Sequence, residues 1–372
     1  MVSTVKLSRR SRWAVPAGAL VVTGGVLAGS LISGGQAQAA PALPSRTPAQ
    51  LLAQVAQSTG PALSGTVTET ASLGLPSLPG NQSPTSITSL LSGSHTVKVA
   101  YAGPQHYRLS LPSPMSETDV IRDGGTAYLW QSTLNTVTEF TVPAHQGKSR
   151  PAATPALTPQ QAAQEALAAV GPTTAVSVDR NDLVAGQAAY ELVLAPRDAR
   201  SLVGQIRIAV DGSNGVPLRV QVFARNAAAP AISVGFTAVT FATPPASETS
   251  FTPPAGAKIV KASADARRPA ARSNPGVSTT GSGWLTVLEV PSSALTATPA
   301  GPPGSTGGSN GGNNDGAAVL HALLAASTPV HGAWGSGRLL HTSLVSVLMT
   351  DSGRTYAGAV QPSVLYAAAA QH

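Results

Sequence analysis

The chain of 372 residues contains no cysteine. This absence excludes disulfide bonds, thiolate metal sites, a cysteine nucleophile and a lipid-modified N-terminal cysteine. Charged residues make up 10% and aromatic residues 4% of the sequence, whereas glycine occurs 37 times and proline 31 times. Low charge and many turn-forming residues favour a protein rich in β-strands over a helical bundle. With no disulfide to stabilise it, the protein must rely on a hydrophobic core, and 42% of its residues are hydrophobic.

The basic residues are unevenly placed. No acidic residue precedes Glu69, and without residues 1–39 the chain has 19 basic and 16 acidic residues, a formal net charge of +3 instead of +7. The early basic residues lead into the apolar segment 14–32, and Ala37-Gln38-Ala39 supplies a small-x-small pattern before Ala40. This order is typical of an export signal and not of a nucleic-acid-binding patch. We expect residues 1–39 to be a signal peptide, with an uncleaved N-terminal anchor as the alternative. The protein is then secreted or held in the cell envelope, without a nucleic-acid partner.

The clearest structural pattern surrounds the turn Gly212-Ser213-Asn214-Gly215. Ile206 and Ile208 alternate with Gln205 and Arg207 before it, and Leu218, Val220 and Val222 alternate with polar residues after it. Two alternating segments around a Gly/Asn turn predict an antiparallel hairpin with one apolar and one wet face. Further strands are expected at 63–71, 95–101, 106–111, 118–122, 126–131, 136–142, 175–179, 188–194 and 232–241.

Two segments carry helix-start signals. Thr47-Pro48-Ala49-Gln50 has the spacing of a capping box with proline at the first helical position, and Thr158-Pro159-Gln160-Gln161 repeats it. Each is followed by a narrow apolar stripe, so we expect both helices to lie on a sheet. The predicted fold class is α+β, with a curved antiparallel sheet of about ten or eleven strands forming an unclosed barrel lidded by helices.

The chain divides into four expected regions after these assignments. Residues 1–39 are the signal, 40–262 the half-barrel domain, 263–282 a linker short in apolar residues, and 283–372 a smaller α+β module with a Gly-rich insert at 298–316. Within the smaller module, residues 339–349 are expected to form one long strand.

A search for catalytic or metal-binding patterns finds only weak candidates. Gly307-Gly308-Ser309-Asn310-Gly311 has the letters of a nucleophile elbow but lies in a spacer, and Gly147-Lys148-Ser149 lacks the first glycine of a phosphate-binding loop. His321, His331 and His341 show no close ligand spacing. Glu117 and Asp119 share a strand face and are the best candidate for acid/base work, with a solvated strand edge as the alternative. We therefore expect neither an enzyme, nor a metal, nor a cofactor.

Several short motifs follow one another along roughly residues 45–262. They are Ser92-Gly-Ser-His95-Thr-Val97, Gly103-Pro-Gln-His-Tyr-Arg-Leu109, Asp119-Val-Ile-Arg-Asp-Gly124, Ala127-Tyr-Leu-Trp130, Tyr190-Glu-Leu-Val-Leu194, Gly215-Val-Pro-Leu-Arg219 and Phe251-Thr-Pro-Pro-Ala-Gly256. Their order resembles the LolA-like lipoprotein-carrier superfamily, most of all its exported actinobacterial branch. RseB/MucB envelope-stress regulators share that fold. The resemblance implies an unclosed barrel that holds acyl chains in an apolar cavity beneath helices.

The expected function is therefore that of a non-catalytic, exported protein that binds a lipid or the acyl chain of a lipoprotein. The alternative is an envelope-stress regulator of the RseB/MucB kind that binds a membrane-bound anti-sigma factor. The candidate cavity residues are Leu51, Val55, Tyr128, Trp130, Leu167, Ile206, Ile208, Leu218, Val220 and Val222. Ordinary core packing is the alternative interpretation of the same side chains.

Overall fold

The computed structural model describes residues 43–58, 60–74, 92–142, 158–168, 170–262, 277–292 and 324–371. By its internal contacts the chain divides into residues 1–39 and residues 40–372, and the description concerns the second unit. The predicted signal segment and the Gly-rich insert at 298–316 lie outside the described residues. Among the residues described, no helix is both long enough and apolar enough to cross a membrane.

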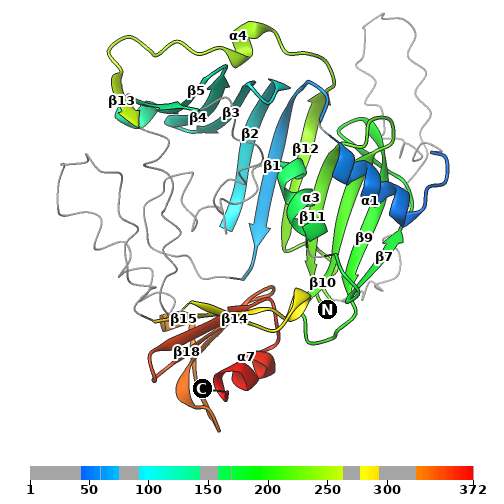
Figure 1. Ribbon diagram of the computed structural model, residues 1–372, viewed down its shortest axis with the longest axis vertical. Coiled ribbons are helices and arrows are strands. Elements are labelled where there is room, and N and C mark those ends of the chain that lie inside the picture. Colours follow the sequence, from blue (N-terminus) through cyan, green and yellow to red (C-terminus); the bar gives the residue numbers. More distant parts are fainter. Residues whose placement is uncertain are drawn as a thin grey trace, which may run out of the picture. The chain divides into compact units, whose positions relative to one another are not determined.

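Thirteen strands form one large sheet in the order β13-β6-β5-β4-β3-β2-β1-β12-β11-β10-β9-β7, with β8 paired to β9 (Figure 1). Their bounds are β1 (Leu63–Ser72), β2 (Ser92–Gly103), β3 (His106–Ser113), β4 (Ser116–Asp123), β5 (Thr126–Gln131), β6 (Thr136–Thr141), β7 (Thr174–Val178), β8 (Asp182–Val184), β9 (Gln187–Pro196), β10 (Val203–Asp211), β11 (Pro217–Ala224), β12 (Ile232–Thr240) and β13 (Lys258–Ala262). All of the strand segments predicted for this domain coincide with strands of the sheet.

The sheet differs from the predicted one in two ways. It is mixed, because β13 runs parallel to β6 while the other pairs are antiparallel. The parallel pair arises because the chain leaves β12, crosses through the short helix α4 (Ala246–Thr249) and reaches the far edge of the sheet in the same direction as β6. With few and short helices the protein is mostly β instead of α+β. Within the described residues β13 and β7 end the sheet, which does not close into a barrel.

The hairpin of β10 and β11 has the predicted turn. The Asp211 carboxylate accepts hydrogen bonds from the backbone N–H of Ser213 at 2.8 Å and of Asn214 at 3.0 Å. Gly215 has a φ of +75°, and a Cβ at this position would lie 2.5 Å from the side chain of Gln54 in the first helix. Glycine is therefore required both for the turn and for the close approach of the helix.

Two helices pack against the sheet, α1 (Pro48–Gln57) and α3 (Pro159–Ala168). The capping box predicted for α1 is present, with the Gln50 N–H donating to Thr47 Oγ1 at 3.3 Å and the Thr47 N–H donating to Gln50 Oε1 at 2.9 Å. Thr158 and Gln161 make the same reciprocal bonds before α3. These bonds satisfy backbone donors that a helix start leaves free.

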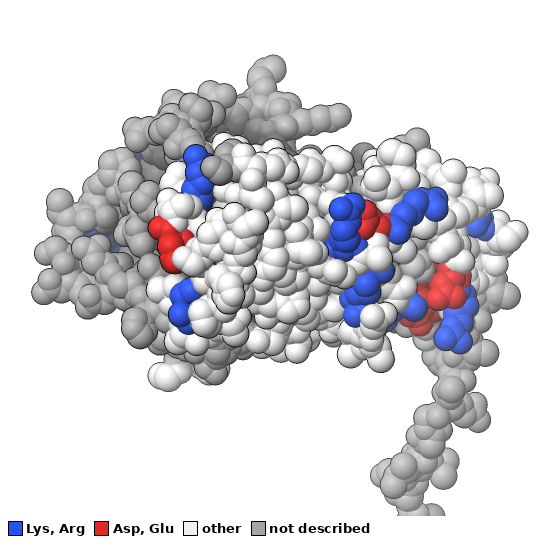
Figure 2. Space-filling model, turned by 90° about the horizontal axis from the view of Figure 1, so that it is seen from below, with Lys and Arg blue, Asp and Glu red and all other residues white. Residues whose placement is uncertain are grey.

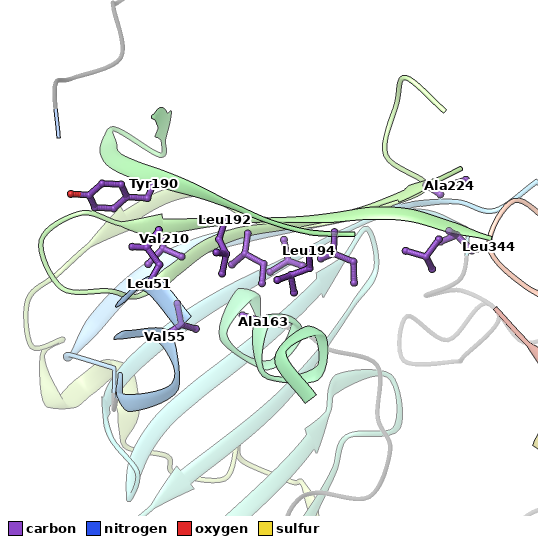
Figure 3. Close-up of a cluster of buried hydrophobic side chains, with 14 of the residues drawn as sticks. Leu51, Val55, Ala163, Tyr190, Leu192, Leu194, Val210, Ala224 and Leu344 are labelled. Carbon is purple, nitrogen blue, oxygen red and sulfur yellow. The ribbon is translucent and has the colours of Figure 1, made fainter. Parts of the chain in front are cut away.

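The main core lies between these helices and strands β9, β10 and β11. Figure 3 shows the α1 side chains Leu51 and Val55 and the α3 side chain Ala163 on one side of the strands, beside Leu192, Leu194 and Val210. Leu51, Ala163, Leu192 and Ile208 are all fully buried in this cluster. We call this side of the sheet the inner face and the opposite side the outer face.

The C-terminal region forms a second, six-stranded antiparallel sheet in the order β14-β15-β19-β18-β17-β16. Its elements are β14 (Ser278–Thr280), β15 (Val287–Pro291), β16 (Thr328–Gly332), β17 (Gly335–His341), β18 (Ser346–Thr350), β19 (Arg354–Gly358) and the helix α7 (Pro362–Ala369). The first strand begins at Ser278, inside the range expected as linker. The single long strand predicted at 339–349 is wrong: the chain turns between β17 and β18, where the Thr342 hydroxyl accepts from the Val345 N–H at 3.0 Å.

The second sheet joins the main core through a few specific contacts. Leu344 belongs to the core cluster that contains Leu51 and Ile208. The Leu202 N–H donates to the Ala359 carbonyl at 2.9 Å, and the Gln361 N–H donates to the Arg200 carbonyl at 2.8 Å. Residues 40–372 accordingly form one compact unit.

Removal of side-chain volume from the main core should destabilise the protein. Ile208 is fully buried under the helices, so Ile208→Ala is expected to lower the free energy of unfolding by about 2–5 kcal/mol. Ile259→Ala, in a side chain that is 51% exposed, is expected to change it by less than about 1 kcal/mol. Urea unfolding followed by circular dichroism measures both, and equal losses would contradict this assignment of the core.

Candidate functional site

The inner face continues beyond the helices as an apolar surface over β2–β5. Residues paired directly across two strands lie on the same side of a sheet. Ile208 is paired with Val220, Val220 with Val234, and Val234 with Glu69, so all four residues lie on the inner face. Val67 is two residues from Glu69 and is paired with Val97, which is two residues from Val99. From Val99 the pairs run to Leu109, Val120 and Leu129 in turn. We call Val99, Leu109, Val120 and Leu129 the apolar row.

The apolar row is less buried than the core under the helices. Val99 is 8% exposed, and Leu109, Val120 and Leu129 are each intermediate between buried and exposed. Val97 and Leu111, both buried, lie on the same face and belong with Val99 to a second core cluster. The row therefore connects a packed core with side chains that solvent still reaches.

A second row of inner-face residues runs beside the apolar row, two positions along each strand. It consists of Tyr101, Tyr107, Arg122, Ala127 and Phe140, paired in that order from β2 to β6. The rings of Tyr101 and Tyr107 are stacked, with centroids 6.5 Å apart and an interplanar angle of 29°. Burial and the neighbouring Tyr107 raise the pKa of Tyr101, so the Tyr101 hydroxyl is a neutral hydrogen-bonding group near pH 7.

A buried carboxyl group also lies on the inner face. Glu69 is 7% exposed and is paired across the strands with His95. Burial raises the pKa of Glu69, and the nearby His95 partly opposes that rise. Its position between Val234 and His95 places it at the junction of the helix-covered core and the apolar surface.

The residues predicted to line a cavity fall into three groups. Leu51, Val55, Ile206, Ile208 and Val220 belong to the main core, and Leu167 and Val222 pack against it, so α1 and α3 lie directly on the strands. Leu218 is fully buried in the second cluster with Val67, Val97 and Phe236. Tyr128 and Trp130 stand apart, because they alternate with Leu129 and so lie on the outer face.

The carboxylate pair singled out from the sequence also lies on the outer face. Asp119 is fully buried and forms an ion pair with Arg108, while Trp130 is its direct partner on β5. Burial and the adjacent Asp119 carboxylate raise the pKa of Glu117, and Arg108 lowers it. Tyr128 packs against Phe251, which follows α4, with ring centroids 5.1 Å apart. This group is covered by the chain segment that leads to β13 and lies on the opposite face of the same strands as the apolar row.

The outer face of β9–β11 carries an ion-pair group of its own. Arg207 lies 3.2 Å from Glu191, and Arg219 lies 2.6 Å from Asp182, measured between nitrogen and oxygen atoms. Burial raises the pKa of Glu191, while Arg207 and Arg219 lower it. On the face of the molecule drawn in Figure 2, basic and acidic side chains likewise lie beside one another in small groups separated by wide uncharged areas.

The remaining sequence candidates do not come together. Ser309, Lys148 and His321 lie outside the described residues. His331 is exposed on β16, whereas His341 Nδ1 lies 2.9 Å from Ser346 Oγ. Within the described part of the chain no three His, Asp or Glu side chains are grouped so as to hold a metal ion. A pocket of about 300 Å³ is lined by Thr173, Asp198, Arg200, Trp284, Leu285 and Val364, among others, and includes none of the predicted residues.

Comparisons with known proteins give structural matches only. No family model matches the sequence, and no curated protein does. The MucA/MucB complex of Pseudomonas aeruginosa matches with 15% identity and a TM-score of 0.41, covering 87% of this chain and 96% of that chain. A crystal structure of MucB in complex with MucA(peri) matches with 14% identity and a TM-score of 0.41, covering 86% and 96%. A LolA superfamily protein from Nitrosomonas europaea matches with 11% identity and a TM-score of 0.21, covering 56% and 99%.

The structure is thus similar, at low sequence identity, to the two groups of proteins that the sequence motifs resemble. Sequence reasoning had pointed to the strands of the apolar row but missed its residues. It selected the aromatic side chains of β5, although Leu129 between them is the one that faces inward.

The carboxyl pair gives a testable titration. The pKa of Glu117 should lie above the ordinary glutamate value, so this group stabilises the fold at low pH, and that contribution is lost as pH rises through its native pKa. Asp119→Asn should lower the pKa of Glu117, since Asp119 raises it. NMR titration of the Glu117 carboxyl carbon measures the change. Glu139→Gln, on the outer face of β6, is the control and should leave the pKa of Glu117 unchanged. A higher pKa of Glu117 in Asp119→Asn would refute the assignment.

Proposed function

We propose that the protein is a non-catalytic binding protein that holds an acyl chain of a lipid or lipoprotein against the apolar row. The observation that carries this proposal is the continuity of that row: Val99, Leu109, Val120 and Leu129 lie side by side on four strands, and the last three remain partly accessible. An acyl chain placed across the strands would meet an apolar side chain at each strand. Strands lie about 4.8 Å apart, so the row spans roughly 14 Å.

The energetics of such binding need no specific polar contact. Each buried methylene contributes about 0.8 kcal/mol, so ten of them contribute about 8 kcal/mol before the cost of ordering the chain. This agrees with the absence, along the described inner face of β2–β5, of a grouped set of acid, base and nucleophile. The carboxylates Glu117 and Asp119 lie on the other face of the sheet.

The apolar row is a better candidate for the ligand surface than the space beneath α1 and α3. There Leu51, Val55 and Ile208 are at most 1% exposed, so a chain of methylenes could enter only if a helix moved away. Close-packed cores of this kind leave few voids larger than a water molecule. The helices then serve to complete the core beside the binding surface, and the ligand lies next to them.

The proposal includes an extracytoplasmic location, supported by the basic and apolar pattern of residues 1–39. A lipid-binding protein outside the cytoplasm would act as a carrier between membrane surfaces.

A second proposal is favoured by one observation on the smaller sheet. Val277 and Leu288 are 42% and 41% exposed, and Leu288 lies on β15 beside the edge strand β14. Exposed apolar side chains near a sheet edge suit contact with another protein. The protein would then be a regulator that binds a membrane protein partner, such as an anti-sigma factor, through this sheet.

Replacement of a residue in the apolar row should weaken binding of a lipid chain. Leu129→Asn is expected to weaken binding of a fluorescent long-chain fatty acid by tenfold or more, because the lost apolar contact is worth about 1.5–3 kcal/mol. Fluorescence titration of the full chain measures the dissociation constant.

Two control variants separate the proposals. Met115→Asn changes a side chain that is 96% exposed in the β3–β4 turn and should leave fatty-acid binding unchanged. Leu288→Asn should also leave it unchanged, but should reduce recovery of a membrane protein partner if the second proposal holds. A protein that binds no fatty acid in any variant would overturn the lipid-binding proposal.

A further inference from the structure

The charged residues of β3–β6 are divided very unequally between the two faces of the sheet. All residues of these four strands are described, and the register places every charged one except Arg122 on the outer face. The outer-face members are Arg108, Glu117, Asp119, Asp123 and Glu139. Arg122 is therefore the one charged residue on the inner face of these four strands.

No residue of the described part of the chain neutralises this charge. No ion pair or hydrogen bond connects the Arg122 guanidinium with another described side chain. The acidic residue next to it in sequence, Asp123, points to the other face, where it lies 3.3 Å from His106. Arg122 is nevertheless only partly exposed. A guanidinium that loses hydration without gaining an anion is costly, and it is stabilised by a bound carboxylate or phosphate.

The neighbours of Arg122 are suited to the same kind of ligand group. Tyr107 is its direct partner on β3, and Tyr101 stacks on Tyr107 from β2. Tyrosine hydroxyls donate hydrogen bonds to oxyanions without adding charge. Three other titratable side chains of β1–β6 and β13 share this face: Lys258 on the edge strand β13, which is paired with Thr136, and Glu69 and His95, which lie on β1 and β2 and are paired with each other across the strands. Arg122 thus provides the positive charge and the two tyrosines provide neutral donors.

The strand register fixes the position of this polar group beside the apolar row. Arg122 is two residues from Val120, and Tyr107 is two residues from Leu109, so the two rows run parallel about 6.6–6.8 Å apart. An amphiphile lying across the strands would meet apolar side chains with its chain and Arg122 with an anionic end. A neutral chain would bury against the same row but leave Arg122 without a counter-charge.

We propose that Arg122, with Tyr101 and Tyr107, binds the oxyanion headgroup of a single-chain amphiphile whose hydrocarbon chain lies on the apolar row. The inference rests on the proposed lipid-binding function and adds the ligand class, an acyl chain that ends in a carboxylate or a phosphate ester. Arg122 is the residue that selects charged over neutral lipids.

The test compares ligands of equal chain length. Hexadecanoate and hexadecanol are titrated into the full chain by competition with a fluorescent fatty acid, and hexadecanoate is expected to bind at least tenfold more tightly. Arg122→Gln should remove this preference and leave hexadecanol binding unchanged. Arg122→Lys should restore part of it, because lysine keeps the charge but not the bidentate geometry. The preference of the unaltered chain should fall with added salt if it is electrostatic.

Control variants and a third ligand make the outcomes distinct. Lys98→Gln removes a positive charge from the outer face of β2 and should leave the preference intact. A lysophosphatidic acid that binds more tightly than hexadecanoate identifies a phosphate headgroup, and the reverse order identifies a carboxylate.

The possible failures are also distinguishable. Equal binding of hexadecanoate and hexadecanol, unchanged in Arg122→Gln, would overturn the headgroup inference and leave the lipid-binding proposal standing. If Arg122→Gln weakened the binding of both ligands equally, Arg122 would have a structural role, and the headgroup inference would be overturned as well. Failure to bind any of the three ligands would overturn the proposed function itself.

Discussion

Strand pairing is the constraint on which the rest of the structure depends. Side chains alternate along a strand and paired residues share a face, so each pairing passes the inner and outer assignment on to the next strand. From Leu192 on β9 to Leu129 on β5 this assignment runs through eight neighbouring pairs of strands. A slip of one residue anywhere along it would turn an apolar surface outward and bring charged side chains against the helices. The core, the apolar row and the position of Arg122 all follow from it.

Much of this arrangement can be predicted from the sequence because its signals are local. The turn at 212–215 and the Asp123-Gly124 turn specify hairpins, and the Thr-x-x-Gln spacing specifies the starts of α1 and α3. The pairing of Asp123 with Thr126 even determines that Val120 opposes Leu129. The hairpin register therefore predicts that Leu129 lies on one face of the sheet and Tyr128 and Trp130 on the other. Aromatic character alone does not distinguish the two faces.

Other features depend on distant parts of the chain and have no local signal. An apolar residue such as Ile208 looks the same in sequence whether a helix or a ligand covers it, and only the packing of Leu51 and Ala163 decides between them. The ion pair of Arg108 with Asp119 joins residues that are diagonal to each other across two strands. The parallel pairing of β13 with β6 likewise cannot be read from a turn, because no turn connects them.

That parallel pair has a consequence for how the protein folds. The hydrogen bond from the Asn135 amide to the Gly256 carbonyl spans 121 residues of sequence. Contacts of such high sequence separation form late, since the chain between them must first lose its freedom. Until then β6 is an unpaired edge next to apolar strands, an arrangement that invites association between copies. Once β13 is in place, its lysines Lys258 and Lys261 form part of the new edge, and charged edges of this kind discourage further strand addition. The strand that pairs across this distance therefore also protects the finished sheet against aggregation.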